Sequence, residues 1–280
     1  MAAIVMDGKA LAAKVKERVR RQVEQLDIKP GLAVVLVGDD PASRVYVNGK
    51  KKDCGECGIY SEEYALPGET TQKELLELVA ALNDREDIDG ILVQLPLPSH
   101  LNEKEVLLAV RPDKDVDCFH PFNVGQLMIG EEGFKPCTPA GVMELLQEYG
   151  IDPAGKHCVI VGRSNIVGKP QAMLMVQKNA TVTICHTRTR NLKEMCLQAD
   201  ILVAAAGRVG LISADMVKEG AVVIDVAMNR NEAGKLCGDV DLAAVEPKAS
   251  YITPVPGGVG PMTRAMLMRN ILTAAEAHLK

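Results

Sequence analysis

Short apolar segments rich in Val and Ile alternate along this chain with longer amphipathic segments. In the first 110 residues, apolar stretches at 32–37, 59–66 and 88–95 alternate with helical patterns at 10–26 and 72–82 and with a polar helix that follows the turn 38–41 and runs to about residue 57. Two parallel strands need a crossover connection, and that connection is usually a helix. The alternation therefore predicts an α/β fold with a parallel sheet.

Residues 111–139 interrupt this rhythm with four prolines, at positions 112, 121, 136 and 139. We expect a functional loop and a domain boundary here. The alternation then resumes, and apolar β-branched segments predict strands at 157–161, 181–185, 201–205 and 221–226, with a final helix at 262–279. We expect two domains, one formed by residues 1–140 with the helix 262–280, the other by residues 141–261.

Composition excludes several classes of protein. Of the 280 residues, 47% are hydrophobic and 25% are charged, which is typical of a globular chain rather than a disordered one. The net charge of −5 argues against a general nucleic-acid binder, and no apolar run is long enough to cross a membrane. The first residues lack the pattern of a secretory signal, so we expect a cytoplasmic protein whose eight cysteines are reduced.

A glycine turn in the second half has the layout of a phosphate-binding site. The segment 158–161 leads into a turn at 162–170, which starts at Gly162, and a helical pattern follows it. Backbone N–H groups and the helix dipole favour an anion at such a turn, although an ordinary β-to-α connection remains an alternative. The next strand ends in 186–190, His-Thr-Arg-Thr-Arg, without the acid that binds the ribose of NAD. This favours NADP over NAD, unless the segment is only a solvated basic turn.

Polar side chains in the first half point to proton chemistry. Ser43, Tyr46 and Lys50 are spaced to share one face of a helix, and Gln94 follows an apolar strand. A Tyr four residues before a Lys can transfer protons, but a solvated helix face is the common alternative. The pair also resembles the short-chain dehydrogenases. In that family the glycine loop precedes the pair, whereas here it follows by more than a hundred residues, so we discount this reading.

No metal site is predicted. The sequence 113–117 resembles the start of a calcium loop, but Cys118 occupies the place of the required Gly. Cys54 and Cys57 lack the second pair that a zinc site needs, so we interpret them as buried or idle thiols. The five His show no ligand spacing.

Several strings together carry a resemblance to a known family. They are V-G-D-D-P-A-S-R-V-Y-V-N-G-K, D-G-I-L-V-Q-L-P-L-P, P-D-K-D-V-D, P-C-T-P-A-G, V-I-V-G-R-S-N-I-V-G-K-P and I-T-P-V-P-G-G-V-G-P-M-T. From about residue 5 to 275 the chain resembles the bifunctional methylenetetrahydrofolate dehydrogenase/methenyltetrahydrofolate cyclohydrolase family. The resemblance implies two α/β domains with parallel or mostly parallel sheets, the second a Rossmann-type NADP-binding domain, with the active-site cleft between them. It also implies a homodimer.

The implied activity is the NADP-dependent oxidation of 5,10-methylenetetrahydrofolate to 5,10-methenyltetrahydrofolate, followed by hydrolysis to 10-formyltetrahydrofolate in one-carbon metabolism. Removing a hydride from the methylene carbon needs alignment only, whereas hydrolysis needs proton transfer. Two rival classes remain: a carbonyl reductase that uses Tyr46 and Lys50 with NADP, and a regulator that binds NADP without turnover.

The resemblance implies roles for individual residues. The catalytic residues are Lys50, which carries the proton, Tyr46, which packs on the folate, Gln94, which tunes Lys50, and Asp117, which holds the pterin. The other substrate-binding positions are Ser43, Val93, Leu95, Pro256, Gly257, Gly258, Val259 and Gly260, of which 256–260 form a loop that closes over the folate. The cofactor-binding positions are Gly162, Arg163, Ser164, Val167, Thr187 and Met228.

Two places depart from the family pattern. Cys118 stands where a Gly normally follows Asp117, and Ala227-Met228 replaces Gly-Ile near the expected nicotinamide contact. A Gly would permit positive φ, which a Cys adopts only with strain. We therefore expect the loop at Cys118 to have shifted to a conformation that suits a side chain.

Overall fold

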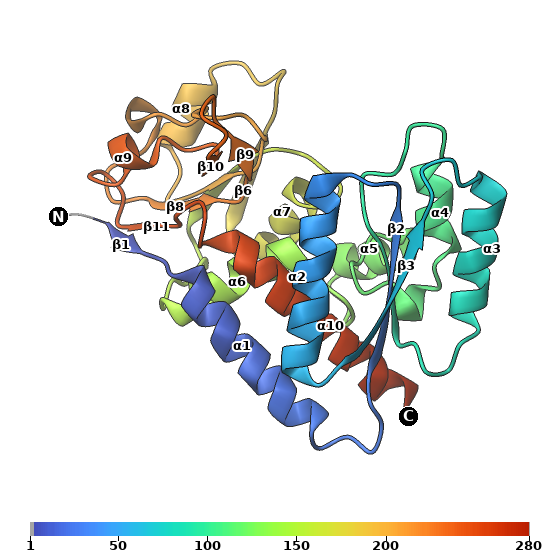
Figure 1. Ribbon diagram of the computed structural model, residues 1–280. Helices are drawn as coiled ribbons and strands as arrows, with labels where there is room; N and C mark the ends of the chain where they lie inside the picture. The colour runs from blue at the N-terminus through green and yellow to red at the C-terminus, as the bar shows by residue number, and fades with distance from the viewer. Residues whose placement is uncertain (1–2, 280) are drawn as a thin grey trace. The chain divides into compact units, whose positions relative to one another are not determined.

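A computed structural model describes residues 3–279 (Figure 1). By its internal contacts the chain divides into two compact units. The three-stranded unit comprises Ala13–Cys137 and the chain from Arg264 onward. The six-stranded unit comprises the chain up to Ala12 and Thr138–Thr263.

The three-stranded unit has the predicted βαβαβ order. Its parallel sheet has the order β3-β2-β4, with strands β2 (Gly31–Val37), β3 (Tyr60–Leu66) and β4 (Gly90–Val93). Every residue of β2 is buried because both neighbours and both faces of this central strand are covered. One face packs against helices α3 (Gln72–Asn83) and α4 (Glu103–Ala109), where Val35, Val93 and Val79 share one apolar core.

Helix α2 (Pro41–Cys57) follows β2 and has clear signals at both ends. The Asp40 side chain accepts a hydrogen bond from the Ser43 N–H, and Pro41 stands at the first helical position, where its missing N–H costs nothing. Gly58 ends the helix in the left-handed conformation, with φ 76°. These signals fix where α2 starts, and so which of its side chains stand beside the carboxyl end of β2.

The predicted loop at 111–139 is wrong in part, because it contains regular structure. A 3-10 turn, η1 (Pro112–Lys114), precedes helix α5 (Pro121–Ile129), and α6 (Cys137–Glu148) begins before the segment ends. His120 Nδ1 accepts a hydrogen bond from the Phe122 N–H, Pro121 opens the helix, and Gly130 closes it with φ 82°. Proline at a helix start and glycine after its end are helix signals that the proline count concealed.

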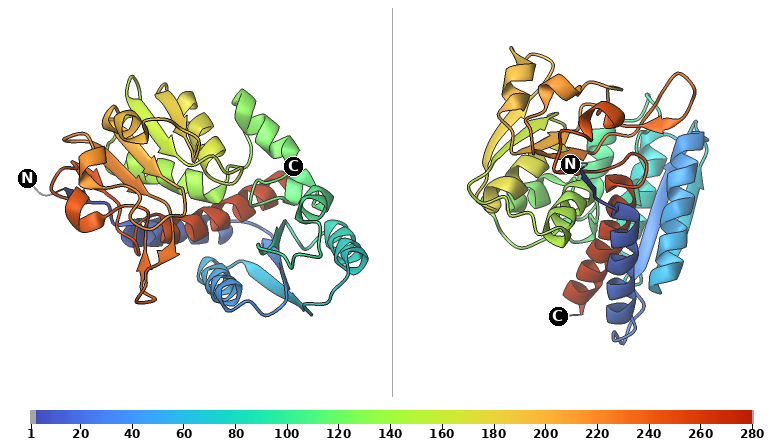
Figure 2. Two further views of the ribbon diagram at one scale, coloured as in Figure 1. Left: turned by 90° about the horizontal axis from the view of Figure 1, so that it is seen from above. Right: turned by 90° about the vertical axis from the view of Figure 1, so that its left-hand side faces the viewer.

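The six-stranded unit contains the second parallel sheet, in the order β1-β11-β8-β7-β5-β6. The predicted strands are present as β5 (His157–Val161), β6 (Thr181–Cys185), β7 (Ile201–Ala204) and β8 (Val222–Asp225). The connecting elements are α7 (Gly168–Gln177), α8 (Leu192–Leu197), η2 (Ala214–Met216) and α9 (Leu242–Val245). A hairpin of β9 (Asn229–Arg230) and β10 (Leu236–Cys237) extends from this unit (Figure 2).

Two short strands of the six-stranded sheet were not predicted, and neither were the two strands of the hairpin. β1 (Ile4–Val5) pairs in parallel with β11 (Tyr251–Ile252), and β11 continues the sheet beside β8. The first residues of the chain therefore lie in the six-stranded unit, whereas the prediction placed all of 1–140 in the other domain. A two-residue strand is too short to produce a periodic pattern, and this one forms only because β11 offers a free edge.

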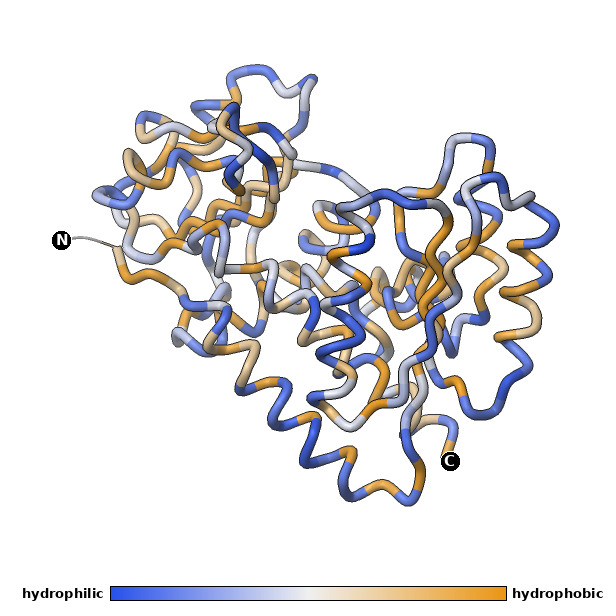
Figure 3. Tube along the Cα trace, viewed as in Figure 1, coloured by the Kyte–Doolittle hydropathy of each residue, from blue (hydrophilic) through white to orange (hydrophobic). Residues whose placement is uncertain are grey.

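Two long helices, α1 (Gly8–Val23) and α10 (Val259–His278), each contribute residues to both units. Along α1 the buried Leu11, Val15 and Val19 recur every fourth residue, and Figure 3 shows the corresponding alternation of apolar and charged positions. α10 begins at Val259, so Val259 and Gly260 form its first turn and do not lie in a loop as predicted. Between residues 3 and 279, no helix is long and apolar enough to span a membrane.

Candidate functional site

Lys50 and Gln94 form the centre of a polar group in the three-stranded unit. Lys50 lies on α2, Gln94 directly follows β4, and Lys50 Nζ donates a hydrogen bond of 3.0 Å to Gln94 Oε1. Gln94 Nε2 donates to the Leu95 carbonyl at 2.7 Å, and the Gln94 backbone N–H donates to Val35 at 2.8 Å. Only one orientation of the amide satisfies both side-chain bonds, so its oxygen faces the ammonium group.

The other predicted residues of α2 share the face of Lys50. Ser43 is buried in the first turn of α2. Tyr46, which stands between Ser43 and Lys50 along the helix, is 39% exposed. Burial raises the pKa of Tyr46, while the positive charge of Arg264 acts in the opposite direction. A neutral, partly exposed ring beside an ammonium group can pack on a planar ligand.

The Asp117 carboxylate is close enough to Lys50 for the two charges to interact. Burial raises its pKa, and the positive charge of Lys50 and a hydrogen bond from Cys137 partly oppose that rise. The Cys137 Sγ lies 3.8 Å from Asp117 Oδ1. The fold thus brings together Lys50, Gln94 and Asp117, which come from a helix, a strand end and a loop.

Two residues that support Asp117 were missed in the sequence. Asn270 on α10 is buried, and its Nδ2 donates to the carbonyl groups of Val116 at 2.7 Å and Lys135 at 2.9 Å. This amide joins the segments that carry Asp117 and Cys137. Cys137 lies within the P-C-T-P string, but its contact with Asp117 has no sequence signal. In the sequence, Asn270 is only an amide side chain within a mostly apolar stretch of the final helix.

The expectation for Cys118 is wrong. Its φ is 60°, so the backbone keeps the left-handed conformation that a Gly would adopt. The side chain is fully buried, and the Sγ donates to the Phe134 carbonyl at 3.3 Å. The thiol therefore gains a buried position and an acceptor, which offset the strain of positive φ.

In the six-stranded unit, the carboxyl ends of the central strands align at one edge of the sheet. Val161 of β5 pairs with Cys185 of β6 on one side and with Ala204 of β7 on the other, and Ala204 pairs with Asp225 of β8. The chain leaves β5 toward β6 and then returns to β7 across β5. Ligands of open α/β sheets bind at such a reversal of strand order.

The glycine turn after β5 is tightly packed. Gly162 has φ 145°, and a Cβ there would lie 2.2 Å from the Ala205 carbonyl oxygen. A Cβ on Gly168 would lie 2.2 Å from the Gly162 carbonyl oxygen, so both positions need glycine. Ser164 Oγ accepts from the N–H groups of Val167 at 3.1 Å and Gly168 at 3.4 Å, while Arg163 and Ser164 are exposed.

The turns after β6 and β8 lie at the same edge. Thr187, Arg188 and Arg190 are exposed, and no acid stands among residues 186–190. After β8, Met228 is 43% exposed, and the Ala227 N–H donates to Asp225 Oδ1 at 3.2 Å. These residues flank the glycine turn on both sides of β5.

The segment 256–260 also belongs to the six-stranded unit. Gly257 has φ 110°, and its carbonyl accepts from the Lys9 N–H at 3.0 Å. A Cβ on Gly8 would lie 1.8 Å from the Gly258 carbonyl oxygen, so α1 and this segment touch backbone to backbone. Pro256 is exposed and Gly258 is buried, so residues 256–258 form a partly exposed turn directly ahead of α10.

The six-stranded unit can hold a dinucleotide. The glycine turn leaves no room for side chains at Gly162 and Gly168, and the first N–H groups of α7 follow it directly. Exposed cations lie next to it, as a 2′-phosphate requires.

Within the described residues, no three His, Cys, Asp or Glu side chains gather in a way that could hold a metal ion. Burial raises the pKa of Cys54 and Cys57 to about 12, which makes both thiols inert.

Known protein families match both parts of the chain. Residues 6–117 match the tetrahydrofolate dehydrogenase/cyclohydrolase catalytic domain, and residues 136–279 match the NAD(P)-binding domain of the same family. The chain is 60% identical over 277 residues to a bifunctional protein FolD of Ruminiclostridium cellulolyticum, covering 98% of each chain. It is 59% identical to that of Acetivibrio thermocellus, covering 100% of this chain and 99% of the relative.

Solved structures give the same result. The FolD methylenetetrahydrofolate dehydrogenase/cyclohydrolase of Campylobacter jejuni is 52% identical, with a TM-score of 0.97 and 99% of each chain covered. The Trypanosoma brucei enzyme, solved with NADP cofactor and inhibitor, is 38% identical, with a TM-score of 0.96 over 100% of this chain and 99% of that one. The chain belongs to the tetrahydrofolate dehydrogenase/cyclohydrolase family.

Proposed function

We propose that this chain oxidises 5,10-methylenetetrahydrofolate with NADP⁺ and then hydrolyses the resulting 5,10-methenyltetrahydrofolate to 10-formyltetrahydrofolate. The observation that carries the proposal is the 3.0 Å hydrogen bond between Lys50 and Gln94, with the half-buried Asp117 close enough to Lys50 for their charges to interact. A ketone reductase would need no such amide partner for its lysine, and a regulator would need no proton carrier at all. The family membership supports the same reactions.

The three-stranded unit would bind the folate. Asp117 would accept hydrogen bonds from the pterin's amino and ring N–H groups, and the Tyr46 ring would pack on the folate. Ser43, Val93 and Leu95 would line the same site, because they adjoin the start of α2 and the end of β4. The family resemblance assigns residues 256–260, in the six-stranded unit, to substrate binding as well.

Lys50 is the proposed proton carrier of the hydrolysis. Water adds its oxygen to the carbon between the two folate nitrogens, and the bond from that carbon to N5 breaks. The products are 10-formyltetrahydrofolate and one proton. Lys50 Nζ, as the neutral amine, accepts one proton from the attacking water and delivers it to N5, and the other proton of that water leaves to solvent as the formyl C=O forms. Gln94 Oε1 holds the Lys50 nitrogen in place.

The six-stranded unit would bind NADP. When bound, NADP⁺ supplies the acceptor for the hydride that leaves the methylene carbon. The chain's own contribution is to orient it: Gly162, Ser164 and Val167 would surround the pyrophosphate, and Arg163 and Thr187 would meet the phosphate groups. Met228 would lie beside the nicotinamide, with Ala227 adding one methyl group nearby. The T. brucei relative solved with NADP supports this choice of cofactor.

The proposal extends to assembly and location. A second copy of the chain is the expected partner, as a homodimer, because the family resemblance implies it. A cytoplasmic location suits the eight cysteines, all of which are free thiols. Sedimentation of the purified protein would test the dimer.

A spectrophotometric assay of the full chain tests the reactions. With methylenetetrahydrofolate and NADP⁺, we expect NADPH to form, and with methenyltetrahydrofolate alone, we expect its absorbance to fall as 10-formyltetrahydrofolate forms. Turnover of simple ketones with NADPH, without either folate reaction, would favour the reductase. NADP binding without any turnover would favour the regulator.

A further inference from the structure

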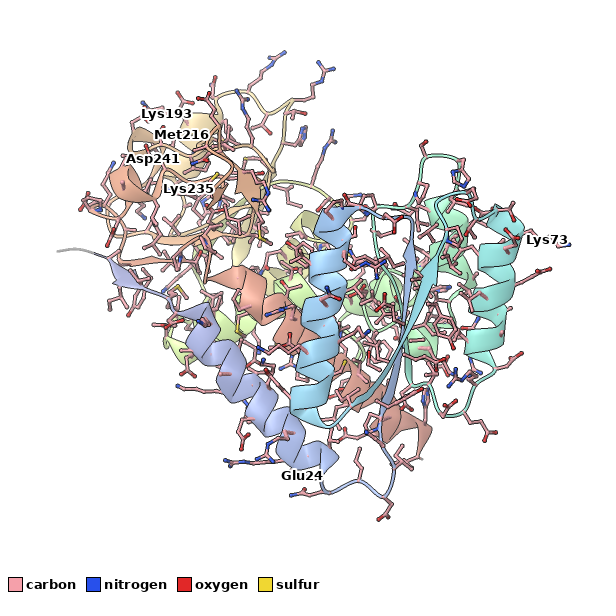
Figure 4. All side chains as sticks on the ribbon, viewed as in Figure 1. Glu24, Lys73, Lys193, Met216, Lys235 and Asp241 are labelled. Atoms are coloured by element: carbon pink, nitrogen blue, oxygen red, sulfur yellow. The ribbon has the colours of Figure 1, made fainter. Side chains whose placement is uncertain are left out.

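Two buried aspartates lie beneath the cofactor edge of the six-stranded unit. Asp225 ends β8 and is 3% exposed, and Asp239 follows β10 and is fully buried. The segment that contains Asp239 lies between Lys235 and Asp241, which are labelled in Figure 4. The proposed reactions use neither aspartate directly, and a carboxylate is seldom buried without a structural or functional reason.

The Asp239 carboxylate is surrounded by neutral donors from two loops. Its Oδ2 accepts from the N–H groups of Ala206 at 2.6 Å and Gly207 at 3.0 Å. Its Oδ1 accepts from the Arg208 N–H at 2.6 Å and from Asn229 Nδ2 at 2.9 Å. Three successive N–H groups that converge on one anion form a nest, which Gly207 permits with φ 68°.

Asp225 in turn holds Asp239. Asp225 Oδ1 accepts from the Asp239 N–H at 3.1 Å, and its Oδ2 accepts from the Val240 N–H at 2.8 Å. A Cβ on Gly238 would lie 1.9 Å from Asp225 Oδ2, so the approach needs a glycine. The end of β8 is thereby connected through two carboxylates to the segment after β7.

This connection reaches the proposed cofactor site on two sides. The segment held by Asp239 begins one residue after Ala205, whose carbonyl oxygen packs against Gly162 of the glycine turn. Ala205 is itself bonded to β5, since its N–H donates to the Val161 carbonyl at 2.8 Å. Asn229, the fourth donor, directly follows the exposed Met228. One carboxylate therefore holds the backbone of the segment after β7 and, through the Asn229 side chain, the segment after β8.

We propose that Asp239 is a positioning residue for the dehydrogenase reaction: it holds the loops after β7 and β8 in the arrangement that receives NADP⁺, and the hydrolysis does not depend on it. This inference rests on the proposed function. The two activities of one chain make it testable, since only the oxidation uses the cofactor.

The test compares Asp239→Asn with Asp241→Asn in the full-length protein. The Asn side chain keeps the shape but turns an N–H₂ group toward N–H donors, so at least one bond of the nest is lost. We expect the KM for NADP⁺ to rise at least about tenfold, the loss of one charge-assisted hydrogen bond, with hydrolysis of methenyltetrahydrofolate unchanged within about twofold. Asp241 is exposed and caps α9 two residues away, so its variant should change neither activity.

Asn229→Ala is the second variant, because it keeps the carboxylate and removes one donor. We expect a KM for NADP⁺ raised about threefold, since a neutral hydrogen bond contributes less than a charged one. An equal loss of both activities in Asp239→Asn, or an unchanged KM for NADP⁺, would overturn the inference.

Calorimetric titration with NADP⁺ separates this inference from the proposed function. If the wild type binds NADP⁺ but oxidises no folate, the proposed function fails, while the affinity of Asp239→Asn for NADP⁺ still tests the positioning role. Equal affinities of wild type and Asp239→Asn would overturn the positioning role whatever the wild type catalyses.

Discussion

The proposed sites of the two units consist of different kinds of chemical groups. In the three-stranded unit the proposed working groups are side chains: an amino group, an amide and a carboxylate that come from α2, the end of β4 and a loop. In the six-stranded unit the proposed site is mostly backbone, with glycines that allow close approach and N–H groups at the start of α7. Proton transfer needs a titratable group, whereas holding a cofactor needs shape and dipoles. The comparison predicts that replacing a titratable side chain impairs the site in the three-stranded unit. Adding a side chain at a glycine should impair the site in the six-stranded unit.

The largest expected effect is at Lys50. Lys50→Met should lower the rate of methenyltetrahydrofolate hydrolysis about 10³-fold, because a general acid–base group is removed, while NADP-dependent oxidation survives. Lys51→Met is the matched control. Its ammonium group donates to Glu63 Oε2 on β3 at 2.8 Å and takes no part in the Lys50–Gln94 pair, so hydrolysis should stay near the wild-type rate. If Lys50→Met hydrolysed methenyltetrahydrofolate at the wild-type rate, the site in the three-stranded unit would not depend on a titratable side chain, and this side of the comparison would be wrong.

The second prediction concerns a substitution that should impair the use of NADP⁺ and spare the hydrolysis. Gly162→Ala places a Cβ 2.2 Å from the Ala205 oxygen at a φ of 145°, so the turn must move. We expect the KM for NADP⁺ to rise about 100-fold, or about 2.7 kcal/mol, with hydrolysis retained. Gly155→Ala, with φ 71° and open space around its Cβ, should cost only about 1 kcal/mol of stability and leave cofactor use intact. Parallel kinetics and denaturant melts of both variants would measure this, and an unchanged KM in Gly162→Ala would contradict it.

The third prediction concerns the few side chains that the cofactor site does use. The wild type should prefer NADP over NAD by at least about tenfold in kcat/KM, equivalent to about 1.4 kcal/mol from one charge-assisted phosphate contact. Arg163→Ala should remove most of that ratio with little change in NAD use. Arg230→Ala on β9, also exposed in the same unit, should leave the ratio intact. Equal use of both cofactors by the wild type would refute the assignment.

The smallest expected effect concerns the backbone conformation at Cys118, in the three-stranded unit. At Cys118 both Gly and Ala lose the thiol and its bond to the Phe134 carbonyl, but only Gly relieves the φ of 60°. We therefore expect Cys118→Gly to be more stable than Cys118→Ala by about 1 kcal/mol, the reverse of the usual order. Denaturant unfolding of the two variants measures the difference. A more stable Ala variant would show that the positive φ stores no strain.

Much of the architecture could be predicted from the alternation of apolar and amphipathic segments. The strands β5 and β6 have the predicted bounds, because their β-branched runs are buried and flanked by polar turns. Ser43, Tyr46 and Lys50 share a helix face as their spacing implied, since 3.6 residues per turn is a local property. Helix α5 was missed because its capping signals stand among prolines that are also typical of loops.

Tertiary structure alone decided which distant residues meet. Nothing in the spacing connects Asn270 with Val116, or Asp239 with Ala206 and Asn229, yet these contacts hold the loops of both sites. The pairing of β1 with β11 joins segments more than 240 residues apart. By itself the sequence determined local burial, helix faces and turn chemistry, because these depend on neighbours along the chain. The partners of buried polar groups depend on how the elements pack, and only the folded chain specifies them.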